Sequence, residues 1–268
     1  MKKVLSELSI AVLFVGGVWF LLSQVNWLSV LGMNNSEERL ENQLGEIFEE
    51  YLNNEEEEVE APAIYSPVDS LLNHLCSAND IERESIQLHV VRKDVVNAYV
   101  VPGRHMVVYT GLLAKCSSEA ELAGVIGHEL AHIEKKHVMK KLIRQAGLAV
   151  LVSLTAGNGG AEAAAQLMKL LSAASYSRDM EREADFTSVD YLIKADIDPE
   201  PFAELMYQFS EKDHEMPAAL KYLSTHPASE ERAVDIINYM QGQNCQKYPV
   251  LHPQTWDNMK VKVKDEDF

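Results

Sequence analysis

Residues 118–132 read SEAELAGVIGHELAH, and this stretch decides how the rest of the chain is interpreted. Ser118, followed three residues later by Glu121, forms a capping box, in which a hydroxyl and a carboxylate satisfy backbone N–H groups left unpaired by the first helical turn. The pattern predicts a helix over residues 119–144. His128 and His132 then lie on one face of that helix, one turn apart.

Two imidazoles at this spacing suit a single zinc ion, which binds neutral histidine nitrogens at roughly 2.0 to 2.1 Å. Glu129 is placed to take a proton from a water molecule on such an ion. Gly127 and Ala131 are small, which is expected where another element packs closely against the helix. A catalytic zinc also needs a third protein ligand, and that ligand must come from elsewhere in the chain.

Residues 177–185, SRDMEREAD, contain the best candidate for this third ligand. They are expected to open a second long helix, with Glu181 and Asp185 on one face because they are four residues apart. Glu181 can bind the metal while Asp185 accepts the free ring N–H of a ligand histidine. His137 is expected to be a surface residue, because on one continuous helix it would point away from the histidine pair.

The N-terminus carries a targeting pattern. Lys2 and Lys3 precede a largely apolar run at residues 8–31, which is long enough to cross a bilayer because a spanning helix needs roughly 20 apolar residues. Residues 1–32 are expected to be a membrane anchor, with a cleaved signal peptide as the alternative. The lysines before the run predict a single-pass inner-membrane protein with its domain on the periplasmic side. Signal cleavage would instead release a periplasmic or secreted protein.

The formal net charge of −17 argues against binding to nucleic acid or to an anionic lipid surface, because both would repel the chain. Residues 33–65 are crowded with glutamate and are interpreted as a solvated acidic linker, although apolar residues at helical spacing would make its first half a helix. Cys76, Cys116 and Cys245 include no Cys-x-x-Cys pair. An oxidising compartment would allow one disulfide among them, and the sequence does not choose the pair.

Between the linker and the histidine motif, the sequence predicts a short helix and a small sheet. The helix is expected at residues 68–79. Three runs rich in β-branched residues predict a small antiparallel meander, at residues 86–91, 95–101 and 105–110. Beyond the motif, residues 146–174 read as two apolar helices separated by glycines, each too short to span a membrane and therefore interpreted as a hairpin packed on the domain.

With these motifs in place, the chain resembles the M48 family of gluzincin zinc metallopeptidases, and within it the periplasmic assembly-factor branch. The matches come in order over about residues 66–238. They are Asn97-Ala98-Tyr99 before Pro102-Gly103, Thr110-Gly111-Leu112-Leu113, the histidine motif, Ser177-Arg178 with Glu181 and Ala184-Asp185, and His226-Pro227 with Arg232.

The resemblance implies further roles. Glu181 would be the third zinc ligand, and Asn97 with Ala98 would lie by the edge strand along which an extended peptide is held by β-augmentation. His226 has two interpretations: it donates to the oxyanion of the tetrahedral intermediate, or it occupies the open zinc position and makes the resting enzyme latent. Arg232 would hold the His226 loop by pairing with a carboxylate.

We therefore expect an α+β, mostly helical, zincin-like metallopeptidase domain at residues 66–243, with a small antiparallel sheet, an N-terminal transmembrane helix and a C-terminal tail at residues 244–268. It would bind one zinc ion per chain and hydrolyse damaged or misassembled envelope proteins, with Glu129 as general base. The alternative is a zinc-stabilised chaperone or assembly factor that binds unfolded envelope proteins with little turnover. Because the segment after His226 is short, the substrate adaptor would be a separate partner protein.

Overall fold

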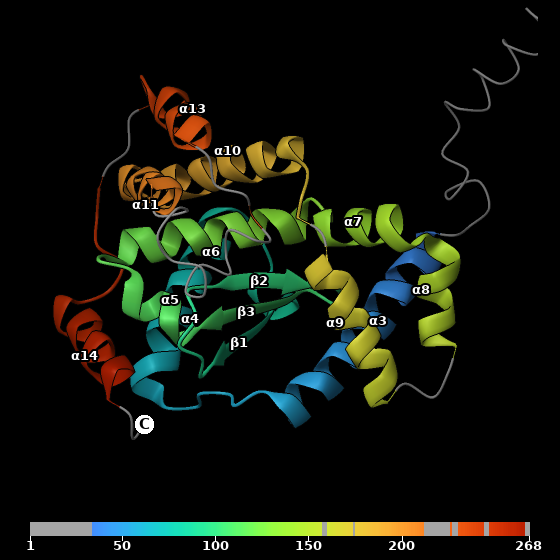
Figure 1. Cartoon of the computed structure of the whole chain (residues 1–268). Coiled ribbons are helices and arrows are strands. Elements are labelled where there is room, and N and C mark those ends of the chain that lie inside the picture. Colours follow the sequence, from blue (N-terminus) through green and yellow to red (C-terminus); the bar gives the residue numbers. More distant parts are fainter. Residues whose placement is uncertain are drawn as a thin grey trace, which may run out of the picture. The chain divides into compact units, whose positions relative to one another are not determined.

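The computed structural model describes residues 34–156, 160–173, 175–211, 226, 230–243 and 247–265 (Figure 1). The chain divides into two compact units, Met1–Glu41 and Asn42–Phe268, and the second unit contains the sheet and the site. The membrane anchor predicted at residues 1–32 lies outside the described residues. Within the part of the chain that is described, no helix is both long and apolar enough to cross a membrane.

The sheet of the second unit has three strands in the order β1-β3-β2. Strands β2 (Ala98–Val101) and β3 (His105–Tyr109) are antiparallel, and β1 (Gln87–Val91) runs parallel to β3. The predicted antiparallel meander is therefore wrong, because β3 lies between the other two strands. Every residue of β3 is buried, as is typical of a strand in the centre of a sheet. The residue pattern of one strand does not predict this position, because strand order depends on burial across the whole sheet.

The two edges of the sheet differ. At the outer edge of β1, the Val59 N–H donates to Val90 O at 2.7 Å and the Arg92 N–H donates to Glu57 O at 2.8 Å. Among the described residues, no backbone segment pairs with the outer edge of β2. An edge strand with unpaired N–H and C=O groups is a template for pairing with another extended chain.

The segment expected to be a solvated linker is structured. Helix α3 spans Asn34–Glu55, and Leu44, Phe48 and Leu52 on it are buried. These residues repeat every four positions, so they form an apolar stripe whose burial offsets the entropy of ordering a glutamate-rich segment. The solvated-spacer interpretation is therefore wrong, whereas the helical alternative for its first half is confirmed.

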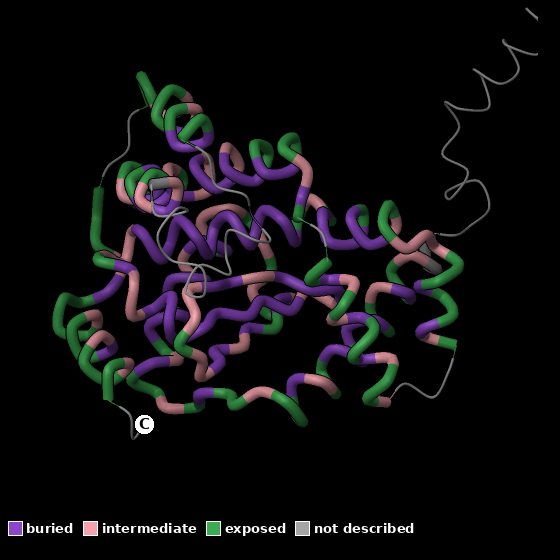
Figure 2. The backbone as a smooth tube through the Cα atoms, viewed as in Figure 1, coloured by how far each residue is buried: buried purple, intermediate pink, exposed green. Residues whose placement is uncertain are grey.

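Four further α-helices follow α3 in chain order, up to the end of the histidine-motif region. They are α4 (Pro62–Ala78), α5 (Thr110–Lys115), α6 (Glu119–Glu134) and α7 (His137–Ala146). The predicted helix at residues 68–79 is confirmed, and it begins earlier. Figure 2 shows α6 and the neighbouring strands buried along most of their length.

Helix α6 begins as the capping box predicts and ends earlier than predicted. The Glu121 N–H donates to Ser118 Oγ at 3.2 Å, while the Glu121 carboxylate accepts from the Ser117 N–H at 2.7 Å. The single helix predicted over residues 119–144 is wrong, because Lys136 adopts a left-handed conformation with φ of 53° and separates α6 from α7. No glycine marks this break, so the sequence gives little warning of it.

The close approach of α6 to α10 (Arg178–Lys194) positions the site. A Cβ atom on Gly127 would lie 2.8 Å from Ser188 Oγ, and that hydroxyl donates to Gly124 O at 2.8 Å. A Cβ on Gly124 would lie 2.4 Å from Phe202 Cβ on α11 (Glu200–Glu211). The small residues of the motif therefore let neighbouring helices pack directly on the α6 backbone.

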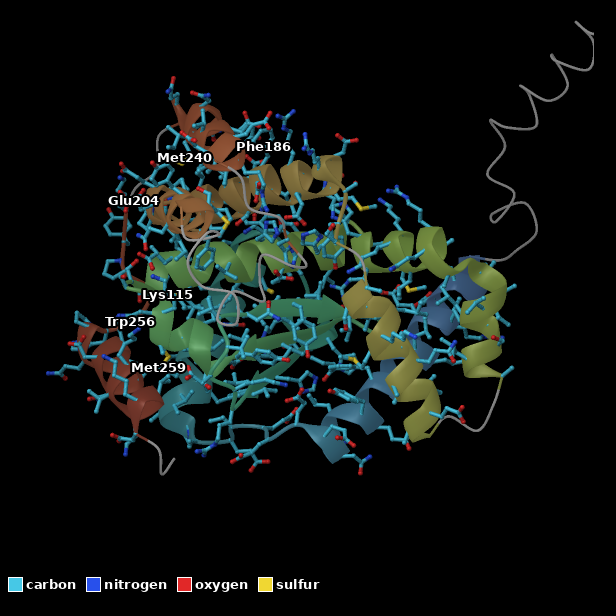
Figure 3. All side chains as sticks on the ribbon, viewed as in Figure 1. Lys115, Phe186, Glu204, Met240, Trp256 and Met259 are labelled. Atoms are coloured by element: carbon cyan, nitrogen blue, oxygen red, sulfur yellow. The ribbon has the colours of Figure 1, made fainter. Side chains whose placement is uncertain are left out.

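The remaining helices complete the unit. The predicted helix pair of residues 146–174 is present as α8 (Leu148–Thr155) and α9 (Ala161–Ala173). Helix α13 (Glu230–Met240) packs on α10, where Phe186 stacks on Tyr239 at a centroid distance of 4.3 Å. Figure 3 labels Phe186 on α10 and Met240 at the end of α13.

The C-terminal tail contributes a helix that the sequence did not indicate, α14 (Pro253–Lys264), which packs on α4 and α5. Its Lys260 ammonium donates to the carbonyl oxygens of Leu113, Ala114 and Cys116, near the end of α5. Cys76 and Cys116 are buried free thiols, so they do not form a disulfide with each other. Cys245 lies outside the described residues.

The contact between Gly127 and Ser188 predicts a thermodynamic coupling. Replacing a helix-interior glycine by alanine ordinarily stabilises a protein by about 1 kcal/mol. In Gly127→Ala, the added methyl must displace the Ser188 hydroxyl from its bond to Gly124, so this gain is lost. In a Ser188→Ala background the same change should be stabilising. Urea unfolding of the two single variants and the double variant should give a coupling of about 0.5 to 3 kcal/mol, and additive effects would contradict the proposed close contact.

Candidate metal centre

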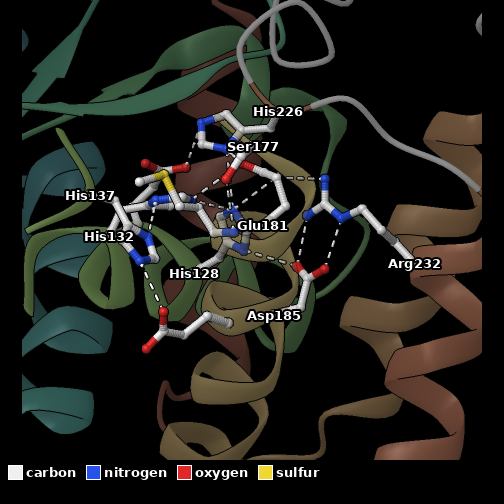
Figure 4. A network of polar contacts seen from close by, with 11 residues as sticks. His128, His132, His137, Ser177, Glu181, Asp185, His226 and Arg232 are labelled. Atoms are coloured by element: carbon white, nitrogen blue, oxygen red, sulfur yellow. Dashed lines mark hydrogen bonds and ion pairs between the residues drawn. The ribbon is translucent and has the colours of Figure 1, made fainter. Parts of the chain in front are cut away.

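Helix α6 carries the first three residues of the site, His128, Glu129 and His132, all fully buried. Helix α10 brings Glu181 against them from the facing side, and His226 approaches the same point (Figure 4). The structure therefore brings together residues that are up to 98 positions apart in the sequence.

Four donor atoms surround one point. His128 Nε2 lies 3.0 Å from His132 Nε2 and 3.2 Å from His226 Nδ1. Glu181 Oε1 lies 3.1 Å from His226 Nδ1 and 3.5 Å from His132 Nε2. Ligands bound to zinc at 2.0 to 2.1 Å in a tetrahedron are separated by roughly 3.3 Å. The donor set and its spacing therefore fit one zinc ion.

The nitrogen of His128 that faces away from this point contacts Asp185. His128 Nδ1 lies 3.0 Å from Asp185 Oδ1. Arg232 donates to both oxygens of Asp185, at 2.7 and 2.8 Å, and its Nη1 lies 2.7 Å from Glu181 Oε2. Burial alone would raise the pKa of Asp185, but the Arg232 guanidinium outweighs this effect and lowers that pKa to about 2. Asp185 therefore remains an anion that can fix the orientation of His128.

The predicted surface position of His137 is wrong. His137 is buried, its Nδ1 lies 2.9 Å from His132 Nδ1, and its Nε2 lies 3.3 Å from Glu183 Oε2. The left-handed Lys136 turns the chain, so that His137 opens a new helix instead of continuing α6. The second ring nitrogen of His128 thus contacts the Asp185 carboxylate directly. The second ring nitrogen of His132 contacts His137, which in turn contacts the Glu183 carboxylate.

Glu129 lies beside the donors without a hydrogen bond of its own. Neither of its carboxylate oxygens has a hydrogen-bond partner within the described residues, and its nearest basic contact is His226 Nε2, 3.4 Å from Oε1. Burial, and then the Glu181 carboxylate, raise the pKa of Glu129 well above its usual range. A buried, hydrogen-bond-free carboxylate next to a metal-type donor set is suited to exchange a proton with a small ligand there.

Burial lowers the pKa of His128, His132 and His226. For His226, Arg232 and Lys141 add to this effect. All three imidazoles are therefore held neutral, which is the form that binds a metal ion.

Sequence reasoning missed one aromatic residue of the site. The Tyr176 ring stacks on His132 with 4.0 Å between centroids and an angle of 27°, and it lies 5.1 Å from the His226 ring. Its place directly before Ser177 was the available signal, because the motif that carries Glu181 begins there.

A cavity of about 150 Å³ opens next to these rings. His226 and Tyr176 line one part of it, and Asn97, Tyr99 and Val100 line another. Asn97 is buried, and its Oδ1 accepts no hydrogen bond from the described residues. Ala98 is buried at the start of β2 and is not among the residues that line the cavity.

The contact of His137 with His132 predicts an effect on metal affinity. His137→Leu removes the group that orients His132, and changes of this kind typically weaken metal binding by about 10- to 100-fold. Zinc affinity should be measured by competition with a chromophoric chelator. His252→Asn, which replaces an exposed histidine that caps α14, is the matched control and should bind zinc like the wild type. Unchanged affinity in the His137 variant would mean that His132 is oriented by other contacts.

Comparison with known proteins agrees with this geometry. Residues 65–239 match Peptidase family M48. The chain is 28% identical to the mitochondrial metalloendopeptidase OMA1 of Schizosaccharomyces pombe over 70% of this chain and 57% of that protein. It is 25% identical to the beta-barrel assembly-enhancing protease of Yersinia pestis over 76% of this chain and 45% of that protein. The chain thus spans about half the length of these relatives.

The family match covers more than half of the chain and includes α6 and α10 with all the donors described above. M48 is a family of zinc-dependent metallopeptidases, in agreement with the donor set. This chain belongs to peptidase family M48.

Proposed function

We propose that this chain is a zinc-dependent endopeptidase. The observation that carries the proposal is the buried Glu129 carboxylate, which lies without a hydrogen bond beside the donor atoms of His128, His132 and Glu181. A carboxylate so placed serves as a general base in metal-assisted hydrolysis. Membership of family M48 and the names of the relatives, which are metalloendopeptidases and proteases, support the same activity.

His128, His132 and Glu181 would hold the ion, which when bound supplies a Lewis acid that acidifies water and polarises the scissile carbonyl. Glu129 takes the proton of the attacking water and then delivers it to the nitrogen of the leaving amine. Asp185, fixed by Arg232, keeps the imidazole of His128 in the orientation that presents Nε2. These residues come from rigid helices, so the reacting groups are positioned before the substrate arrives.

The outer edge of β2 would bind the substrate as an extended strand. This edge has no backbone partner among the described residues, while the opposite edge at β1 is already paired. The cavity runs beside Asn97 and Tyr99 to His226, so a peptide added to β2 would pass close to the donors. Pairing through main-chain hydrogen bonds requires an extended segment, which favours unfolded or misassembled proteins as substrates.

His226 would occupy the fourth position in the conformation described. Its Nδ1 lies 3.1 to 3.2 Å from the Glu181 and His128 donor atoms. A catalytic zinc needs one open position for water or substrate, so this arrangement corresponds to a latent form, and withdrawal of His226 would open the site. The interpretation of His226 as an oxyanion donor predicts the opposite effect of its removal.

The substrate class and the location rest on sequence and relatives. One relative is named a beta-barrel assembly-enhancing protease, and we infer that this chain likewise acts on damaged or misassembled envelope proteins. The apolar run at residues 8–31 would tether it to the inner membrane with the domain on the periplasmic side, or would direct its export before cleavage. A separate adaptor protein would present substrates. The net charge of −17 disfavours binding to nucleic acid, which would repel the chain.

Replacing Glu129 tests the proposed chemistry. Glu129→Gln keeps the shape of the side chain and leaves the ligand set intact, so zinc content should be unchanged. Turnover of an unfolded protein should fall by roughly 100- to 10,000-fold, the usual contribution of a general base. Cleavage products are quantified by mass spectrometry with zinc measured in the same samples. Full activity in this variant would refute the mechanism. A wild type that never cleaves, but promotes folding as well as the variant does, would establish the chaperone alternative.

Replacing His226 separates its two interpretations. His226→Ala should retain zinc through the other three ligands and should cleave an unfolded protein faster than the wild type. The gain should be about tenfold for each 1.4 kcal/mol by which the closed form is favoured. A variant that retains zinc but cleaves more slowly would identify His226 as an oxyanion donor instead.

A further inference from the structure

The cavity beside the metal donors contains two lysines in different electrostatic states. Lys93 lies in the part of the cavity lined by Tyr51 and Glu56, and Lys141 lies in the part lined by Tyr176. Lys93 Nζ donates to both carboxylate oxygens of Glu56, at 2.7 and 2.9 Å, so its charge is neutralised locally.

Lys141 has no such partner. It is buried, with a relative exposure of 7%, and its Nζ donates to Leu171 O at 2.9 Å. The ammonium also lies 4.5 Å from the centroid of the Tyr176 ring. Among the described residues, no carboxylate forms an ion pair with it. An ammonium has three donors, so this buried cation retains donors that no described residue accepts.

The carboxylates of Glu181 and Glu129 act on the Lys141 ammonium through their charge, but among the described residues neither forms an ion pair with it, because their direct contacts are with His226 and Arg232. Burial lowers the pKa of Lys141 to about 8, which still leaves its protonated form abundant near neutral pH. A buried cation without a directly paired anion is costly, and an incoming carboxylate would relieve that cost.

The Tyr176 ring connects Lys141 to the metal donors. Tyr176 stacks on His132 and also lies against the Lys141 ammonium. The Tyr176 side chain thus contacts both the cation and a residue that supplies a metal donor. A carboxylate bound to Lys141 would therefore belong to a substrate residue near the scissile bond, and a cavity of about 150 Å³ admits a side chain or a chain end but no folded element.

We propose that Lys141 is a specificity-determining residue that binds a substrate carboxylate in this cavity. The carboxylate comes either from an Asp or Glu side chain or from the C-terminus of the substrate chain. The inference rests on the proposed peptidase function and adds a preference for acidic groups near the cleaved bond. The overall negative charge of the chain does not supply this preference, because it would repel acidic substrates from a distance.

The test compares matched peptides on the zinc-loaded, full-length protein. One set differs only in Glu against Gln and Asp against Asn near the cleavage site, and a second set differs only in a free against an amidated C-terminus. Cleavage (kcat/KM) is measured for the wild type, Lys141→Met and Lys141→Arg. Lys140→Met, the exposed neighbour on the same helix, is the control. Binding of the same peptides to the Glu129→Gln protein is measured by calorimetry, so the outcome does not depend on turnover.

We expect the wild type to prefer the carboxylate over the amide by about 10- to 100-fold, the usual difference for a hydrogen bond to a charged group. Lys141→Met should abolish this preference, Lys141→Arg should keep part of it, and Lys140→Met should leave it intact. The set in which the preference appears identifies the source as a side chain or a chain end. Equal use of acid and amide by the wild type in both sets would overturn the role of Lys141 while leaving the peptidase function standing. Unchanged cleavage by Glu129→Gln would instead refute the peptidase mechanism itself.

Discussion

The packing of α6 against α10 is the constraint on which the rest of the site depends. At Gly127 the two helices approach so closely that no Cβ fits beside the Ser188 hydroxyl, and Ser188 bonds to the α6 backbone instead. This contact sets the distance at which Glu181 and Asp185 face the α6 histidines. Since metal ligation tolerates only a few tenths of an ångström, the small residues around the motif matter as much as the ligands.

Close packing also removes charged groups from water, and these buried groups contact one another. Asp185 lies between His128 and Arg232, and Arg232 also reaches Glu181. Removing one member of such a buried chain leaves an unpaired charge, which typically costs about 3 to 5 kcal/mol. Arg232 therefore stabilises the fold as well as the ligand geometry. Glu129 lies outside this chain of contacts, and neither of its carboxylate oxygens has a hydrogen-bond partner among the described residues, which is why we propose it as the proton-transfer group.

The sequence predicted the parts of the site that depend on local spacing. The shared face of His128 and His132 follows from helical periodicity, and the capped start of α6 follows from Ser118 and Glu121. The shared face of Glu181 and Asp185 follows from their spacing of four residues. The approach of Glu181 to the histidines depends on tertiary packing, so the sequence offered Glu181 as a candidate ligand from its spacing to Asp185, and the family resemblance implied the same role. The break at Lys136 was missed because no local sequence pattern marks a left-handed lysine. As a result, His137 was predicted to lie on the surface of one continuous helix. The parallel pairing of β1 with β3 was missed because strand order is decided by burial across the whole sheet.

The central claim is that His128, His132 and Glu181 hold one zinc ion within reach of Glu129. A crystal structure of the zinc-loaded protein, with anomalous diffraction recorded on both sides of the zinc absorption edge, tests it most directly. The account predicts a single anomalous peak among these three side chains, with His226 either on the fourth position or withdrawn from it. A peak elsewhere, or zinc bound without Glu181, would contradict the account.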